Sequence, residues 1–392
     1  MVTVSERAAR IPAWLSWLAP VVVIAVLVAV FLLLDPIGEL RSVPPAEAVA
    51  VERTVLRDEL IELHVRNDGP DAVTVAQVLV DDAFRPFEMS QQTLGRLDEA
   101  TIEVPYPWDE GVPIRIALLT STGLTIEHEI EAAALTPEPD GRTFITYGLL
   151  GIYIGLIPVI VGLLWFPSLK RASARWIAFF LAFTIGLLAF LLVDTVAEGL
   201  ELASATGVAL DGVSLFAIGA VATFAGLIAL GAGVTKARKE KALAGLPLAY
   251  LIAAGIGLHN LGEGLAVGAA LAAGEVGLGT FLVLGFMLHN TTEGLAIVAP
   301  LGAERERPPF KHFIWLGAVA GLPTVAGAWL GGFAFEPAWA ALAFGIAAGA
   351  IAQVIWAVGK TLPQEHRLGS PMGAAGLVAG LVVMYATGLL TA

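Results

Sequence analysis

The sequence predicts a membrane protein made of an all-α bundle of eight helices, preceded by one transmembrane anchor helix and a small all-β sandwich domain. Of the 392 residues, 57% are hydrophobic and 15% are charged, and the mean hydropathy is +0.80. Apolar runs of about 20 residues, enough to cross a bilayer, recur along most of the chain. Between residues 40 and 140 they give way to short alternating runs, which indicate strands. We therefore expect domains at 1–35, 40–140 and 143–392.

The candidate spans justify the helical part of this prediction. They lie at about residues 13–34, 144–166, 175–196, 212–233, 246–270, 277–299, 312–334, 338–359 and 371–391. The first span resembles a signal peptide in position, but its apolar run from Trp17 to Leu34 exceeds the usual core of about 7–15 residues. No small-residue cleavage site follows it, so we interpret it as an uncleaved anchor.

Basic residues predict which side of the membrane each connection occupies. Arg7 and Arg10 precede the first span, and basic connections follow the second, fourth, sixth and eighth spans, whereas the alternate connections are acidic or neutral. Positive charge marks cytoplasmic loops. The expected protein is therefore a multi-pass cell-membrane protein with a cytoplasmic N-terminus, and with the β domain and the C-terminus outside.

The segment between the first two spans has the pattern of a β-sandwich. Its runs alternate with period 2 and are separated by turn sequences such as "NDGPD" and "TSTG". His64 and the pair His128–Glu129 fall on these expected strands. We expect them on a solvated strand face, with an accessory metal site as the alternative.

Two further properties of the chain limit its chemistry. Cysteine is absent, which excludes disulfides, thiolate metal sites and a cysteine nucleophile. The net charge of −13 argues against a nucleic-acid partner, and the expected partners are the lipid bilayer and a small ion.

A polar triplet occurs twice in the apolar spans, as "HNLGEG" (259–264) and "HNTTEG" (289–294). Because helical residues advance by about 100°, the three side chains of each triplet point in one direction. The two helices are antiparallel, and a rise of about 1.5 Å per residue places both triplets near the midplane. The candidate metal ligands are His259, Asn260, Glu263, His289, Asn290 and Glu293.

Imidazole, carboxylate and amide ligands suit zinc, and also iron(II), manganese or cobalt. A charged group in the membrane is costly unless it faces a cavity or a partner, so a binding site is the favoured interpretation. The alternative is a hydrogen-bonded pair that only holds helices together.

Weaker polar signals occur in other spans. "DTVAEG" (194–199) has the same register, with Asp194 and Glu198 near the outer end, where they could form an acidic mouth that attracts cations or only a helix-end surface. Gln353 is expected to hydrogen-bond between helices, with a ligand role as the alternative. His312 and His366 are expected to be solvated in cytoplasmic loops.

The two central motifs resemble those of the ZIP (Zrt/Irt-like) family of divalent-metal transporters. That family has eight spans, with HNxxEG in the fourth and a similar motif in the fifth, and residues 143–392 reproduce this order. The family's second span often carries H-x-x-P-[DE], and "DTVAE" has that spacing with Asp194 in the first position. The anchor and the β domain are additions to the eight-helix plan.

Two departures from the family pattern concern the number of metals. Thr324 stands where many members carry a glutamate in the sixth span, and the seventh span lacks the frequent Glu-Glu pair. The resemblance therefore implies one principal metal site.

The resemblance implies a metal-ion transporter, with uptake toward the cytoplasm by alternating access between inverted repeats. The transported ion would be zinc or another divalent metal. A metal-selective channel and a metal sensor signalling through the β domain are the alternatives. A metalloenzyme is not expected, because HExxH is absent and six ligands leave no open position. The oligomeric state is open, with a homodimer as one alternative.

Overall fold

The computed structural model describes residues 13–34, 46–130, 133–206, 211–238, 244–272, 276–304, 306–362 and 367–389. The chain forms two compact units, Met1–Pro45 and Ala46–Ala392, which we describe separately. Arg7, Arg10 and His366, used in the predictions above, lie outside the described residues. The three-part domain division stays a prediction.

The first unit contains one apolar helix, α1 (Ala13–Leu34). It carries no charged residue over its 22 positions, which match the length that crosses a bilayer core of about 30 Å. Its described side chains, such as Leu27 at 62% exposed, are open to the surroundings.

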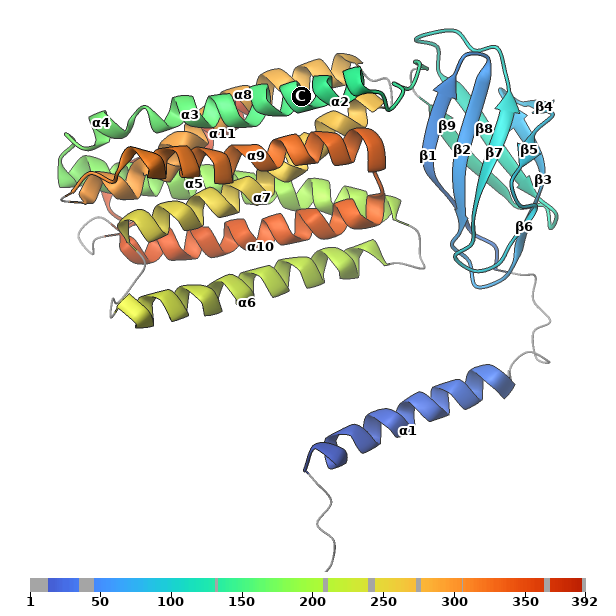
Figure 1. Ribbon diagram of the computed structural model, residues 1–392, viewed down its shortest axis with the longest axis horizontal. Helices are drawn as coiled ribbons and strands as arrows, with labels where there is room; N and C mark the ends of the chain where they lie inside the picture. Colours follow the sequence, from blue (N-terminus) through green and yellow to red (C-terminus); the bar gives the residue numbers. More distant parts are fainter. Residues whose placement is uncertain are drawn as a thin grey trace, which may run out of the picture. The chain divides into compact units, whose positions relative to one another are not determined.

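The second unit begins with two antiparallel β-sheets (Figure 1). The strands are β1 (Val49–Arg57), β2 (Leu60–Asn67), β3 (Val73–Val80), β4 (Ala83–Arg85), β5 (Glu88–Met89), β6 (Thr93–Leu94), β7 (Glu99–Pro105), β8 (Ile114–Thr120) and β9 (Thr125–Ile130). One sheet has the order β1-β2-β7-β5 and the other β4-β3-β8-β9, with β6 pairing with β3.

Alternate residues of the strands form the core of this β-module. In β2, Ile61, Leu63 and Val65 are fully buried, while the intervening side chains are less so. Leu63 pairs with Ile102 of β7, and both belong to one apolar cluster that also includes residues of β3 and β8. The period-2 pattern of the sequence therefore predicted the strands, because one face of each strand is buried.

The rest of the second unit is helical, and the expected long helices are confirmed. The elements are α2 (Gly141–Gly151), the π-helical turn η2 (Ile152–Leu156), α3 (Ile157–Leu163), α4 (Phe166–Leu169), α5 (Ala174–Ala205), α6 (Gly212–Arg238), α7 (Gly245–Ala272), α8 (Val276–Val298), the 3-10 turn η3 (Ala299–Ala303), α9 (Phe310–Ala334), α10 (Pro337–Thr361) and α11 (Pro371–Gly388). Within the described residues, eight helical segments between Gly141 and Gly388 are long and apolar enough to cross a membrane. The protein is thus mostly helical, and its composition is that of a multi-pass membrane protein.

Glycines allow the helices that carry the polar triplets to approach their neighbours closely. A Cβ atom on Gly264 of α7 would overlap the carbonyl oxygen of Thr324 on α9, and one on Gly327 of α9 would overlap that of Leu261. Small residues at such crossings are typical of helix packing in membranes. Helix α6 instead lies at the edge of the bundle, beside α10 (Figure 1).

The expectation that His312 lies solvated in a loop is wrong. Helix α9 begins at Phe310, directly after Pro309, so His312 falls in its first turn. There it is half-buried, and its Nδ1 lies 2.9 Å from the hydroxyl of Tyr250 on α7. Pro309 is the N-cap: its backbone is extended, with ψ of 145°, and its carbonyl accepts from the N–H of His312, so the helix begins at the next residue.

Candidate metal centre

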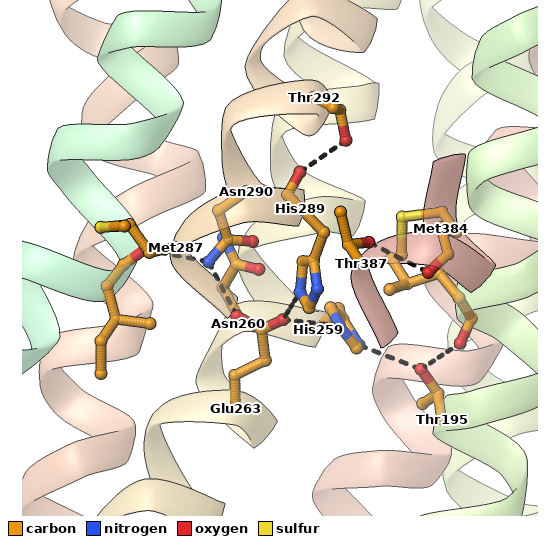
Figure 2. A network of polar contacts seen from close by, with 12 residues as sticks. Thr195, His259, Asn260, Glu263, Met287, His289, Asn290, Thr292, Met384 and Thr387 are labelled. Atoms are coloured by element: carbon orange, nitrogen blue, oxygen red, sulfur yellow. Dashed lines mark hydrogen bonds and ion pairs between the residues drawn. The ribbon is translucent and has the colours of Figure 1, made fainter. Parts of the chain in front are cut away.

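The two polar triplets lie on α7 and α8 and face each other (Figure 2). Each of these residues is at most 6% exposed: His259, Asn260, Glu263, His289, Asn290 and Glu293. One ligand atom from each of His259, His289 and Glu293 lies within 4.8 Å of the others. Among the described residues, this is the single group of histidine and acidic side chains with the spacing of a metal site.

Glu263 connects the two helices at this cluster. Its Oε1 lies 3.2 Å from Nε2 of His259 and also contacts Nε2 of His289. Its Oε2 accepts a hydrogen bond of 2.9 Å from Nδ2 of Asn290. One carboxylate therefore faces both imidazoles, and the side chains of the two triplets form a single polar site.

Backbone carbonyl oxygens orient both asparagines. Nδ2 of Asn260 donates to the carbonyl of Ala320 on α9, and Nδ2 of Asn290 donates to that of Ile154 in η2, each at 3.0 Å. Among the described residues, neither Oδ1 atom has a hydrogen-bond partner, although both are buried. The amide nitrogens are thus held by the protein, and the amide oxygens remain available as ligands.

The acceptor for Asn290 arises from an irregularity in the first helix of the bundle. In a regular α-helix the Ile154 carbonyl would accept from the N–H of residue 158, but Pro158 has none. The chain forms the π-helical turn η2 at this point. π-helical turns are rare in proteins, and those that occur often lie at functional sites.

Thr195 of α5 also reaches the site, although the sequence pattern favoured its neighbours. It is fully buried, and its Oγ1 lies 3.0 Å from Nδ1 of His259. Asp194 is exposed instead. The register of "DTVAEG" was the signal that could have identified Thr195, because it occupies the position of the asparagines in the other two copies.

Glu198, the other acidic residue of this copy, lines a cavity of about 700 Å³. The cavity wall is formed by Glu198, Glu201 and Leu202 of α5, by Leu265 and Ala266 of α7, and by residues of the β-module that include Thr54, His128 and Glu129. Ala266 lies three positions after Glu263 on α7, and Glu198 lies three positions after Thr195 on α5, so each is about one turn from the cluster on the same face of its helix. The cavity therefore approaches the cluster, and Asp194 does not line it.

Two other polar residues of the spans are buried. Thr324 of α9 is fully buried against Gly155 of η2, where a Cβ would overlap its hydroxyl. Gln353 of α10 is 3% exposed. Neither Thr324 Oγ1 nor Gln353 Oε1 has a hydrogen-bond partner within the described parts of the chain.

The module histidines are more enclosed than a solvated strand face. His128 is half-buried, and its Nε2 lies 2.8 Å from the hydroxyl of Thr54. Burial lowers the pKa of His128, which keeps the ring neutral at physiological pH. His64 is 39% exposed at its side chain and lies 3.1 Å from Glu62. The expectation of a solvated strand face is therefore wrong for His128, because its ring is half-buried and contacts Thr54 of β1.

The fold and the site together define a multi-pass membrane protein with a buried histidine and carboxylate cluster between two of its long helices. A comparison with models of known protein families gave no match, and a comparison with curated protein sequences gave none either.

Proposed function

We propose that this protein transports divalent metal ions across the membrane, with zinc as the favoured substrate, and that it is a transporter of the ZIP type. The observation that carries the proposal is the cluster of His259, His289 and Glu293, whose ligand atoms lie within 4.8 Å of one another on helices long and apolar enough to cross a membrane. The resemblance rests on the two motifs and their order among the spans.

The chemistry of the cluster favours a cation. Ionisable groups within a membrane are expensive and mark ion or proton paths. A divalent ion would offset the charges of Glu263 and Glu293, while the imidazoles and amide oxygens add neutral ligands. These ligands suit zinc, and iron(II), manganese and cobalt also fit them.

Uptake toward the cytoplasm is the proposed direction. The basic connections support a cytoplasmic N-terminus and an outer β-module, and on that side Glu198 and Glu201 line the cavity that approaches the cluster. An acidic cavity raises the local concentration of cations. Metal would enter there, lose water and bind between α7 and α8.

A metal sensor is the second candidate, and contacts of the β-module favour it. Arg53 of β1 donates to the carbonyl of Phe333 at 3.3 Å, and Arg66 of β2 lies 3.7 Å from Glu336. Phe333 belongs to α9, which packs closely on α7. A change in α7 on metal binding could thus reach the module without any flux.

Uptake of ⁶⁵Zn into proteoliposomes tests the proposal. We expect uptake by the wild type, and loss of most of it in His259→Ala and Glu293→Ala. His64→Ala in the β-module is the control and should retain uptake. Zinc binding by the wild type without flux would favour the sensor, and equal flux in all four proteins would contradict the site.

A further inference from the structure

The hydroxyl of Thr195 makes two short polar contacts. Its Oγ1 lies 2.7 Å from the carbonyl oxygen of Leu191, one turn earlier in α5, and 3.0 Å from Nδ1 of His259 on α7. The residue is fully buried. Figure 2 shows Thr195 and Glu263 on different sides of the His259 ring.

The direction of both hydrogen bonds follows from their chemistry. A carbonyl oxygen can only accept, so the single hydroxyl proton of Thr195 is donated to Leu191. Oγ1 can then only accept from His259, and Nδ1 of the ring must carry a hydrogen. In the neutral ring the other nitrogen, Nε2, has the lone pair.

Nε2 is the atom that faces the cluster, since it lies 3.2 Å from Oε1 of Glu263. A carboxylate oxygen can only accept, so a cation bound there would take the place of the hydrogen that Nε2 donates in the metal-free protein. In metal sites, the partner of the second ring nitrogen selects the tautomer and orients the ring. We propose that Thr195 is a positioning residue that keeps a hydrogen on Nδ1 of His259, so that Nε2 is the ring nitrogen that binds the transported cation. This rests on the proposed function and assigns a role to a residue outside the two triplets.

The residue type fits this role. Donation to Leu191 commits the hydroxyl proton within the same helix and leaves Oγ1 as an acceptor, which is a common arrangement of threonine in membrane helices. Valine at position 195 would keep the shape and remove the acceptor. Serine would keep the acceptor and remove only a methyl group.

The test compares Thr195→Val and Thr195→Ser in the full-length protein. Thr184→Val is the matched control, because Thr184 is equally buried in α5 and donates to Phe180 at 2.9 Å in the same way, at a position three turns earlier. Zinc affinity is measured by calorimetry in detergent. The hydrogen position on the ring is measured at pH 8 without metal from the ¹⁵N spectrum of protein with labelled histidine. The signals of His259 are those that are absent from the spectrum of His259→Gln.

We expect the wild-type spectrum to show a protonated Nδ1 for His259, and Thr195→Val to show an Nδ1 that has lost its hydrogen, because Glu263 remains as the acceptor at Nε2. Zinc affinity should fall about 10- to 100-fold in Thr195→Val, as for other partners of ligating histidines, and be largely restored in Thr195→Ser. Thr184→Val should match the wild type in both measurements.

Either of two results would overturn the proposal. The first is an unprotonated Nδ1 at His259 in the wild type, a result that can be obtained even if Thr195→Val fails to fold. The second is an unchanged spectrum and zinc affinity in folded Thr195→Val. A wild type that binds no zinc contradicts the proposed function instead, and the ¹⁵N spectrum still decides the role of Thr195.

Discussion

Asn290 donates a hydrogen bond of 3.0 Å to the carbonyl oxygen of Ile154, in a π-helical turn more than a hundred residues earlier in the chain. The acceptor is available because Pro158 provides no N–H to it. A proline in one helix thus helps to orient an amide on another helix, beside Glu263.

Replacing Pro158 with alanine tests this link. The new N–H at position 158 would compete with Asn290 for the Ile154 carbonyl and favour a regular helix. We expect zinc affinity to fall about 10-fold, the lower end for changes around a metal site. Calorimetry in detergent measures it. Pro371→Ala is the control, since Pro371 begins α11, where an N–H would have no helical acceptor. Equal affinities in both variants would contradict the link.

The crossing of α3 and α8 depends on Gly162. A Cβ atom there would overlap the carbonyl oxygen of Thr291 and approach Gly294. Gly162→Ala should therefore push the helices apart and destabilise the bundle by about 1–3 kcal/mol, as overpacked substitutions do. Thermal unfolding in detergent measures the change. Gly226→Ala in α6 is the control, because nothing lies within 4 Å of the Cβ added there. Comparable losses in both variants would contradict this account.

Arg66 holds a buried group of charges together in the β-module. Its side chain is 7% exposed and contacts Glu52, with Asp68 at 3.6 Å and Glu336 at 3.7 Å. Burial raises the pKa of Glu52, and the Arg66 guanidinium opposes this shift. Arg66→Met would leave the acids without their cation.

We expect this variant to destabilise the module by about 3–5 kcal/mol, as when one partner of a buried ion pair is removed. Hydrogen exchange of β1 and β2 in the full-length protein measures it. Arg115→Met is the control: Arg115 is 68% exposed and lies 3.7 Å from the exposed Asp82, so its loss should change stability by less than about 1 kcal/mol. Unchanged exchange in Arg66→Met would show that the acids are solvated without it.

His128 makes the stability of the module depend on pH. Burial lowers its pKa in the folded state below the ordinary value of 6.5. Below pH 6.5 the unfolded chain therefore takes up a proton that the folded module does not, and the free energy of unfolding falls as the pH decreases toward the folded pKa. Hydrogen exchange of β9 at pH 7.5, 6.5 and 5.5 should show this loss. His128→Asn, which does not titrate, should have a weaker dependence, and an identical dependence would contradict the assignment.

The sequence predicted the helices and strands well because burial selects apolar residues: alternate positions in the strands and long continuous runs in the helices. The runs around Ile61 to Val65 alternate with period 2, and the predicted spans of α6 to α11 lie within about five residues of the observed bounds. Helix α5 instead continues to Ala205, nine residues beyond the predicted end at 196. The predicted facing of His259 and His289 also agrees with the structure, since helix period and antiparallel direction decide it. The misplacement of His312 shows the limit, because the start of a helix depends on local turns.

By itself, the sequence determined the class of the protein, the long apolar helices, and which six side chains meet between two of them, because hydropathy and helix period are local properties. Only the tertiary structure decided that Thr195 rather than Asp194 contacts His259, and that carbonyl oxygens of Ile154 and Ala320 hold the asparagines. Those contacts depend on how helices rotate and cross. Backbone acceptors are the same at every residue, so no pattern of side chains could have identified them.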